Sequence, residues 1–326
     1  MGQRHAIGIA QIPELEKIVL TDISDSALLN AQENLKSNSN NQKFFFQKMQ
    51  DFSHEDHFDI GIISATAQNR LSLCEFAVKT KCKFVLVEKP VGQSLTEVKK
   101  LINYFKEKET HAFVNLNMRL YPDSLKLKND LNSKPQLKGI KNITVNTGTV
   151  GIGANGIHYL DYLFFLTDAD DARIISAEID DTIIPSARGI QFKDFGGRCI
   201  LKFYKNQHLV ANVFLSISSQ STVFGGWDIV CPNGRITINE SNGRRTDYIR
   251  KAESEMPIQR YNADYLPPVE SLFESPFLGD LTKLWVEGLM HNEFLLPHID
   301  DALLSHKLMF DWLSYSKNYS DVFPIT

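Results

Sequence analysis

The sequence predicts an α/β protein with two domains, in which a parallel sheet is followed by an α+β domain with a large, mostly antiparallel open sheet. Its 326 residues are too many for one small core. Short apolar runs alternate with amphipathic helical patterns up to about residue 119, which is typical of a parallel sheet. After residue 139, strand patterns follow one another across short polar turns, which favours antiparallel pairing. We therefore expect domains at residues 1–119 and 120–326.

The composition is that of an ordinary globular protein, with 43% hydrophobic and 23% charged residues. A net charge of -4 gives no basic surface, so nucleic-acid binding is not expected. The four cysteines are scattered without metal-type spacing, which favours free thiols in a reducing compartment and no metal site. No apolar run approaches the roughly 20 residues of a membrane helix, and no secretion signal is present. We expect a cytoplasmic protein.

The first domain opens with a helical pattern that ends near Pro13. Its predicted strands are short and apolar, and they cover residues 17–21, 43–47, 58–64, 84–87 and 112–116. Its predicted helices are amphipathic, and they cover residues 24–37, 68–80 and 94–108. A further helix is expected from Pro122 to about Leu131, where the chain enters the second domain.

Residues 83–92, KFVLVEKPVG, form the most informative stretch of the first domain. A buried strand ends abruptly in Glu88 and Lys89, and Pro90 then stops the strand because it has no backbone donor. The carboxyl edge of an open parallel sheet is where ligands bind. Lys89 is therefore predicted to face the active crevice, with Glu88 orienting the lysine or its turn.

Gly2 and Asp22 are separated by about the spacing that joins the last glycine of a G-x-G-x-x-G turn to the acid ending the next strand. Alone, Gly2 would carry no such meaning, but with the family resemblance described below it looks like the last glycine of such a turn, and the first strand and the first two glycines are then missing. We expect an upstream start that was missed, or a trimmed chain. A carboxylate at Asp22 would bind ribose hydroxyls and repel a 2′-phosphate, which favours NAD over NADP, although Asp22 also suits an N-cap of the 24–37 helix.

The second domain carries strand patterns over residues 140–149, 173–183, 198–204, 208–217, 227–231 and 235–239, and helical patterns over 279–290 and 300–315. An open sheet of this kind can bury its outer face against another subunit, so we expect a homo-oligomer, a dimer or a tetramer. Between the predicted strands 140–149 and 173–183, the glycine-rich segment 151–156 leads into a helix whose first turn carries His158. Asp161 follows one turn later on nearly the same face. The helix dipole disfavours an imidazolium there and helps His158 to accept a proton.

These segments together resemble the Gfo/Idh/MocA family, the glucose-fructose oxidoreductase and inositol dehydrogenase relatives. The resemblance rests on Glu88-Lys89-Pro90, on Arg4-His5 after Gly2, on the Asn-x-Arg-x-x-Pro-like stretch 115–122 and on the G-x-H-x-x-D of residues 156–161. It implies a Rossmann-type dinucleotide-binding domain. The cofactor contacts that it implies are Gly2, Arg4, His5, Asp22, Thr66, Asn69, Glu88, Lys89, Pro90, Asn117 and Arg119. The substrate contacts that it implies are Lys89, Tyr121, Asn155, His158 and Asp161.

The sequence departs from the family pattern at two places. Many members have an aspartate four residues before the histidine, where this chain has Ala154, and Asn155 cannot replace an acid or base. The loop after the predicted strand 58–64 carries Ala67 and Arg70 where a proline and a histidine are common in the family. For Arg119, an exposed linker role is as probable as a cofactor contact.

The resemblance implies an NAD-dependent oxidoreductase that acts on a carbinol or ketone carbon of a sugar, a cyclitol or a nucleotide-linked sugar. Lys89, beside the cationic nicotinamide in a partly desolvated cleft, is expected to have a lowered pKa and to transfer a proton, with His158 sharing it. The alternatives are a non-catalytic NAD-binding regulator, because the family includes a galactose-pathway corepressor, and an inactive truncated member.

Overall fold

The protein was analysed as a computed structural model that describes residues 1–53, 55–68, 70–148, 150–186, 188–251, 265–317 and 322–326. The chain forms two compact units, each discontinuous in sequence. The first unit contains Met1–Gly92, Thr96–Leu120 and Pro276–Asp301, and the second contains Gln93–Leu95, Tyr121–Ser275 and Ala302–Thr326. The segment Pro276–Asp301 therefore packs with the first unit, although a division at residue 119 assigns it to the second.

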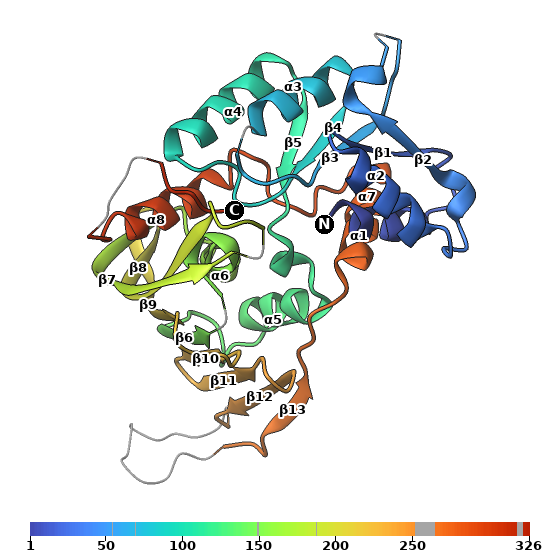
Figure 1. Ribbon diagram of the computed structural model, residues 1–326. Helices are drawn as coiled ribbons and strands as arrows, with labels where there is room; N and C mark the ends of the chain where they lie inside the picture. Colours follow the sequence, from blue (N-terminus) through green and yellow to red (C-terminus); the bar gives the residue numbers. More distant parts are fainter. Residues whose placement is uncertain (54, 69, 149, 187, 252–264, 318–321) are drawn as a thin grey trace. The chain divides into compact units, whose positions relative to one another are not determined.

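The first unit contains two parallel sheets (Figure 1). One pairs β1 (Ile18–Asp22) with β2 (Phe44–Lys48), and the other has the order β3 (Ile60–Ile63), β4 (Phe84–Val87), β5 (His111–Val114). These are the five strands predicted from the apolar runs, and the parallel pairing is confirmed.

No ladder joins β1 to β3 among the residues that the structure describes. Val85 and Val87 of β4 are fully buried, whereas Ile60 and Ile62 of β3 are only half-buried. In the described part of the chain, β3 is therefore an edge strand of its sheet.

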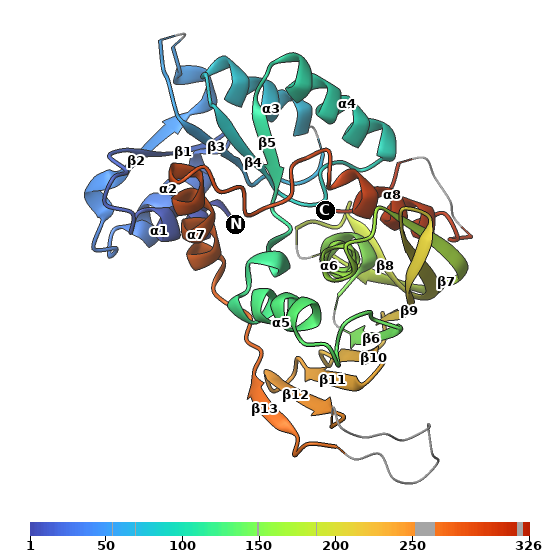
Figure 2. The same cartoon turned by 180° about the vertical axis from the view of Figure 1, so that it is seen from behind.

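The helices of the first unit are α1 (Gly2–Ile9), α2 (Asp25–Leu35), α3 (Arg70–Lys79), α4 (Leu95–Glu107) and α7 (Leu278–Met290), with short helical turns η1 (Asn41–Lys43), η2 (Met49–Asp51) and η3 (Asn117–Leu120). α3 and α4 lie side by side on one face of the β3–β5 sheet (Figure 2). α1 meets α7 at two glycines so closely that a Cβ on Gly8 would lie 1.9 Å from the carbonyl oxygen of Gly279. Ser24 caps α2 by accepting a 3.3 Å hydrogen bond from Ala27 N.

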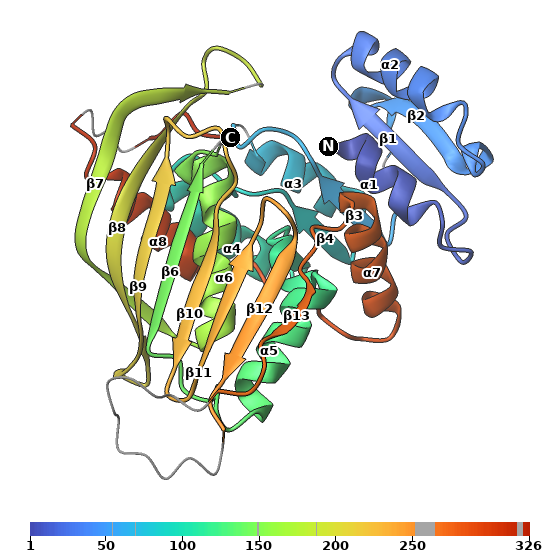
Figure 3. The same cartoon turned by 90° about the horizontal axis from the view of Figure 1, so that it is seen from below.

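The second unit is built on one sheet of eight strands in the order β13-β12-β11-β10-β6-β9-β8-β7 (Figure 3). Every pair is antiparallel except β6 with β9, so the mostly antiparallel sheet is confirmed. The strands are β6 (Asn142–Gly148), β7 (Asp171–Pro185), β8 (Lys193–Lys205), β9 (His208–Ser218), β10 (Gly226–Cys231), β11 (Gly234–Asn239), β12 (Arg244–Ile249) and β13 (Val269–Leu272). The sequence analysis did not anticipate β12 and β13.

Helices α5 (Pro122–Ser133), α6 (Ile157–Thr167) and α8 (Leu303–Leu313) complete the second unit, with a π-helical turn, η4 (Ile152–Gly156), leading into α6. α6 packs on the inner face of the sheet through stacked Tyr159 and Trp227, whose ring centroids lie 5.5 Å apart. The buried Arg245 of β12 binds Asp130 of α5 at 2.6 Å and Asp247 at 2.7 Å. These ion pairs fix α5 to the far end of the sheet.

Candidate functional site

The turn at Glu88, Lys89 and Pro90 lies at the carboxyl end of β4, the edge where parallel sheets bind ligands. The Glu88 amide still continues the ladder by donating to Ile63 O at 3.0 Å. Lys89 follows with only 7% of its surface exposed, and the Lys89–Pro90 peptide bond is cis. The strand thus delivers a nearly buried lysine to the ligand edge of the sheet.

The Glu88 side chain is 1% exposed and its carboxylate accepts three hydrogen bonds. Oε1 accepts from Asn115 Nδ2 at 2.7 Å and pairs with His5 Nε2 at 3.0 Å. Oε2 accepts from the backbone amide of Lys89 at 3.2 Å. The carboxylate therefore ties α1 and the end of β5 to the lysine turn.

Two opposing effects act on the ionisation of Glu88. Burial alone would raise its pKa, because a buried carboxylate loses its hydration. The hydrogen bond and charge of His5, aided by the charge of Lys89 and the Asn115 amide, outweigh burial and lower the pKa of Glu88 to about 2. Glu88 is thus an anion that only accepts hydrogen bonds, and it orients the turn rather than supplying protons.

Arg70, at the start of α3, is a further part of this site. Its guanidinium donates to the backbone carbonyls of Ala65 at 2.6 Å, Thr66 at 3.3 Å and Glu88. With 2% of its surface exposed, it binds the loop after β3 to the lysine turn. The sequence analysis noted Arg70 only as a departure from the family pattern, because nothing in the local sequence shows which carbonyls a lone arginine meets.

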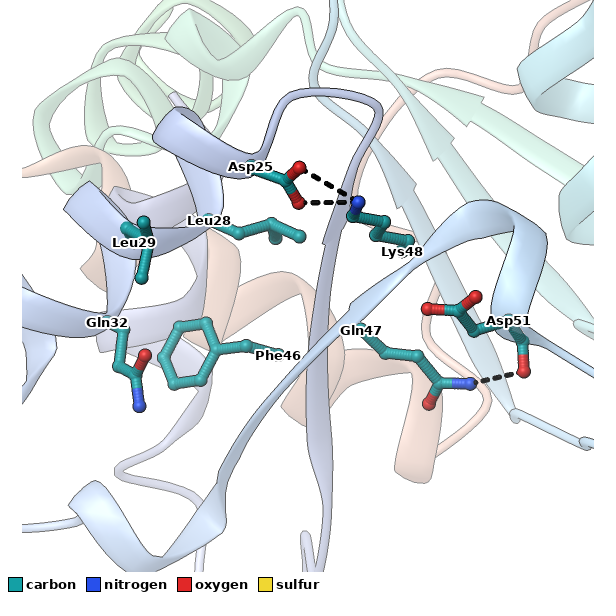
Figure 4. Close-up of a pocket in the computed structure, with 8 residues that line it drawn as sticks. All are labelled: Asp25, Leu28, Leu29, Gln32, Phe46, Gln47, Lys48 and Asp51. Carbon is teal, nitrogen blue, oxygen red and sulfur yellow. Dashed lines mark hydrogen bonds and ion pairs between the residues drawn. The ribbon is translucent and has the colours of Figure 1, made fainter.

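Asp22 ends β1 as predicted, and its side chain is exposed. Its Oδ1 accepts a 2.9 Å hydrogen bond from the amide of Ser24, while Ser24 itself caps α2. In the parallel pairing of β1 with β2, Lys48 lies opposite Asp22. The Lys48 side chain nevertheless pairs with Asp25, with Nζ 2.7 Å from Oδ1 (Figure 4). This pair lies over a hollow of about 380 Å³ lined by α2 and β2. The end of β1 therefore presents carboxylates, with the nearest lysine already paired.

The other predicted cofactor residues of the first unit are spread over several segments. A Cβ on Gly2 would come within 2.9 Å of Ser64 Oγ, so Gly2 lies against the end of β3. Arg4 is exposed on α1, whereas His5 is 1% exposed with both ring nitrogens bound within the chain. Asn117 and Arg119 lie half-buried on η3. Asn69 lies outside the described residues.

His158 is half-buried in the first turn of α6, as predicted, and Asp161 one turn later is 1% exposed. The π-helical turn before α6 is held by Asp194 of β8, which the sequence analysis missed. Its carboxylate accepts from the amides of Gly153 at 2.9 Å and Ala154 at 2.6 Å. A carboxylate from a distant strand thus binds the backbone at the position where many family members carry an aspartate.

A second missed carboxylate, Glu240, lies beside α6 in the same unit. It accepts from Tyr159 OH and from Trp227 Nε1, each at 2.9 Å. Burial raises the pKa of Glu240, and this effect outweighs the two hydrogen-bond donors, which lower it. Tyr121 accepts a 3.2 Å hydrogen bond from Ser275 Oγ, and Asn155 is exposed on η4. Of the five predicted substrate residues, four thus belong to the second unit and Lys89 to the first.

The donors present suit a dinucleotide better than a metal. Within the described parts of the chain, no group of three or more His, Cys, Asp or Glu side chains is arranged to hold a metal ion. The exposed Asp22 carboxylate fits ribose hydroxyls, and the Lys89 turn at the sheet edge fits the reacting end of a nicotinamide nucleotide. Over the same described residues, no helix is long and apolar enough to cross a membrane.

Solved structures with the same fold cover nearly the whole chain. An oxidoreductase from Agrobacterium radiobacter, in complex with NAD+, L-tartaric acid and magnesium, has a TM-score of 0.71 and 13% identity, covering 97% of this chain and 93% of that one. A super-repressor mutant of Gal80p from Saccharomyces cerevisiae has a TM-score of 0.72 and 14% identity, covering 95% and 91%. An NAD-binding oxidoreductase from Klebsiella pneumoniae has a TM-score of 0.71 and 11% identity, covering 96% of this chain and 92% of that one. At these identities the likeness shows the fold alone.

The sequence itself matches one family profile and no curated protein. The profile is that of the oxidoreductase family with an NAD-binding Rossmann fold, and the match covers residues 1–116. These residues include β1 to β5, Asp22, the Glu88 network and the Lys89 turn. Residues 1–116 therefore belong to the NAD-binding Rossmann-fold region of the Gfo/Idh/MocA oxidoreductase family.

Proposed function

We propose that this protein is an NAD-dependent oxidoreductase that acts on a carbinol or ketone carbon of a sugar, a cyclitol or a nucleotide-linked sugar. The observation that carries the proposal is the Glu88 network, which fixes the backbone of Lys89 at the ligand edge of the sheet. A residue fixed in this way is positioned for proton transfer, because efficient transfer requires a defined geometry before it requires a matched pKa.

The chain supplies proton chemistry and orientation. In the oxidising direction Lys89 Nζ, as the neutral amine, takes the proton of the substrate hydroxyl and becomes an ammonium. His158, at the start of α6, shares that proton or binds the hydroxyl oxygen. When bound, NAD would supply the acceptor for the hydride of the carbon that bears the hydroxyl. In the reducing direction Lys89 returns the proton to the carbonyl oxygen.

We propose NAD rather than NADP as the cofactor. Asp22 at the end of β1 and Asp25 in the first turn of α2 place two carboxylates near the position of the ribose. Lys48, the nearby cation, is already paired with Asp25. A 2′-phosphate would meet this negative charge while Lys48 is already paired, so Asp22→Ser should weaken NADH binding and improve NADPH binding relative to NADH.

The alternative is a non-catalytic NAD-binding regulator. The likeness of the fold to Gal80p, at a TM-score of 0.72, favours it as much as the likeness to the oxidoreductases favours an enzyme. Ala154, in place of the family aspartate, also favours it. The proposal prefers the enzyme because Lys89 and His158 are both present and the backbone around each is held by a buried carboxylate, Glu88 and Asp194.

The proposal includes a cytoplasmic homo-oligomer. Four free, buried cysteines suit a reducing compartment. On the outer face of the sheet, Ile200 of β8 and Phe214 of β9 are neighbours in register and are 46% and 38% exposed. Exposed apolar pairs of this kind suit an isologous interface. Light scattering should give more than one chain per particle, and Phe214→Glu should reduce that number.

The test begins with fluorescence titrations of NADH and NADPH, followed by a dehydrogenase screen with sugars and cyclitols. NADH is expected to bind more tightly, and one or more sugars should be oxidised. Lys89→Ala should abolish turnover and spare NADH binding. Lys83→Ala, at the exposed start of the same strand, is the matched control and should keep both. NADH binding without any turnover favours the regulator, and no binding of either nucleotide refutes the proposal.

A further inference from the structure

The two ring nitrogens of His5 have partners that fix the position of their protons. Nδ1 lies 2.7 Å from Thr282 Oγ1, and Thr282 Oγ1 also lies 2.9 Å from the carbonyl oxygen of Leu278. A carbonyl only accepts, and a hydroxyl carries a single hydrogen. The Thr282 hydroxyl therefore donates to Leu278, and the hydrogen between His5 and Thr282 belongs to Nδ1.

The other nitrogen of the ring faces an anion. Nε2 lies 3.0 Å from Oε1 of Glu88, which already accepts from Asn115 and has no hydrogen to give. Nε2 must therefore also carry a hydrogen. A ring with hydrogens on both nitrogens is an imidazolium, so the hydrogen-bond network assigns a positive charge to a side chain that is 1% exposed.

We propose that His5 is a buried imidazolium partner of Glu88 and, through that carboxylate, a positioning residue for Lys89. The resemblance to the family makes His5 a cofactor contact, but its ring is enclosed and both nitrogens are used inside the first unit. Its influence on the ligand edge must pass through Glu88, whose Oε2 accepts the Lys89 amide. The role in catalysis rests on the function proposed above, whereas the charge of His5 does not.

The location of the pair gives it a second effect. His5 belongs to α1, Glu88 follows β4, and Thr282 belongs to α7, which the chain forms almost two hundred residues later. The other charged groups near the pair are cationic: Lys89 beside the carboxylate, and Arg70, which donates to the backbone carbonyl of Glu88. His5 therefore links separate segments to the lysine turn, and neutralising it would leave the Glu88 anion without the cation that hydrogen-bonds to its carboxylate.

The first test is the nitrogen-proton spectrum of the histidine rings in the 15N-labelled full-length chain at pH 7. His5 is expected to show a hydrogen on both ring nitrogens, and His5→Gln assigns that signal among the nine histidines. Glu88→Gln should convert the ring to a form with one hydrogen, on Nδ1. A His5 ring with one unprotonated nitrogen in the parent protein would overturn the charge assignment, whether or not the protein is an enzyme.

The second test separates positioning from cofactor contact. In His5→Gln and in Thr282→Val, the dissociation constant of NADH should stay within about twofold of the parent value, while turnover should fall on the order of 100-fold, as for a reacting group moved by about 1 Å. Loss of NADH affinity with full turnover at saturation would make His5 a cofactor contact instead. Thr80→Val is the matched control, because Thr80 Oγ1 also donates to the carbonyl four residues earlier, at 3.1 Å from Phe76 O, but does not contact His5.

If the parent chain neither binds NADH nor turns over a substrate, the proposed function fails and the ring spectrum still decides the charge of His5. If His5→Gln does not fold, the ring spectrum and the turnover are both measured on Thr282→Val. This substitution removes the acceptor of the Nδ1 hydrogen with little change in side-chain volume. In that variant the ring spectrum at pH 7 should differ from that of the parent, because Nδ1 has lost its acceptor. An unchanged ring spectrum and unchanged turnover in Thr282→Val would refute the positioning role.

Discussion

Replacing Gly8 by alanine should destabilise the first unit, although alanine is the better helix former. The added Cβ would lie 1.9 Å from Gly279 O and 2.5 Å from Gly279 Cα, both backbone atoms of α7. Because ordinary contact begins near 3.4 Å, α1 would have to move away from α7 by about 1.5 Å. A shift of that size breaks the 2.7 Å bond from His5 to Thr282 and lengthens the 3.0 Å contact with Glu88.

The expected loss can be estimated from these contacts. Overpacking costs about 1–3 kcal/mol, and each buried hydrogen bond left unmade costs about 1–3 kcal/mol. The helix propensity of alanine returns about 1 kcal/mol. With one hydrogen bond broken, the free energy of unfolding should therefore fall by about 1–5 kcal/mol, measured from the first urea transition. Hydrogen exchange should also increase in peptides that cover α1 and α7.

The control is Arg4→Ala, one turn earlier on the exposed side of α1, which should change the free energy of unfolding by no more than about 0.5 kcal/mol. If Gly8→Ala is as stable as the parent, or about 1 kcal/mol more stable, helix propensity decides the outcome. The close approach of α1 to α7 would then contribute nothing, and the reasoning above would be refuted.

Three further predictions follow from buried groups. The pKa of Glu88 is lowered from 4.5 to about 2, so the folded state binds its proton less readily than the unfolded chain. Its contribution, about 3 kcal/mol, should be complete above pH 4.5 and lost as the pH falls towards 2, with a smaller acid slope in urea titrations of Glu88→Gln. Asp194→Ala should speed amide exchange at Gly153 and Ala154, because both amides lose their acceptor, while peptides of the first unit stay unchanged. Burial raises the pKa of Cys74 and Cys231 to about 12, so a disulfide reagent at pH 8 should label neither in the native protein and both in denaturant.

The strands and helices that the sequence predicted are those whose buried residues form a simple apolar pattern, either a continuous run or a regular repeat. β4 is one example, because Phe84–Val87 is an uninterrupted apolar run and forms a strand with those bounds. β12 shows why others were missed. Its inward-facing residues are Arg245 and Asp247, and Arg245 forms ion pairs with Asp247 and with Asp130 of α5. A strand that buries ion pairs has no apolar face for a pattern to detect.

The residues of the candidate site also divide into those that a local sequence pattern predicted and those that it did not. Lys89 and Glu88 were identified because their neighbours form a local motif, and the structure places Glu88 beside the Lys89 amide as expected. Asp194 and Thr282 were not identified, because each acts on a segment far away in the sequence. Which carbonyl or amide such a residue meets is decided by tertiary packing, and no spacing in the chain encodes it.

The return of Pro276–Asp301 to the first unit has a consequence for synthesis on the ribosome. α1 and the five parallel strands leave the ribosome early, but the helix that covers α1 and supplies Thr282 comes after residues 121–275. At 5–20 residues per second, those residues take roughly ten to thirty seconds to make. Throughout that interval α1 has no α7 to pack against, so the face that α1 buries against α7 stays exposed until α7 has emerged.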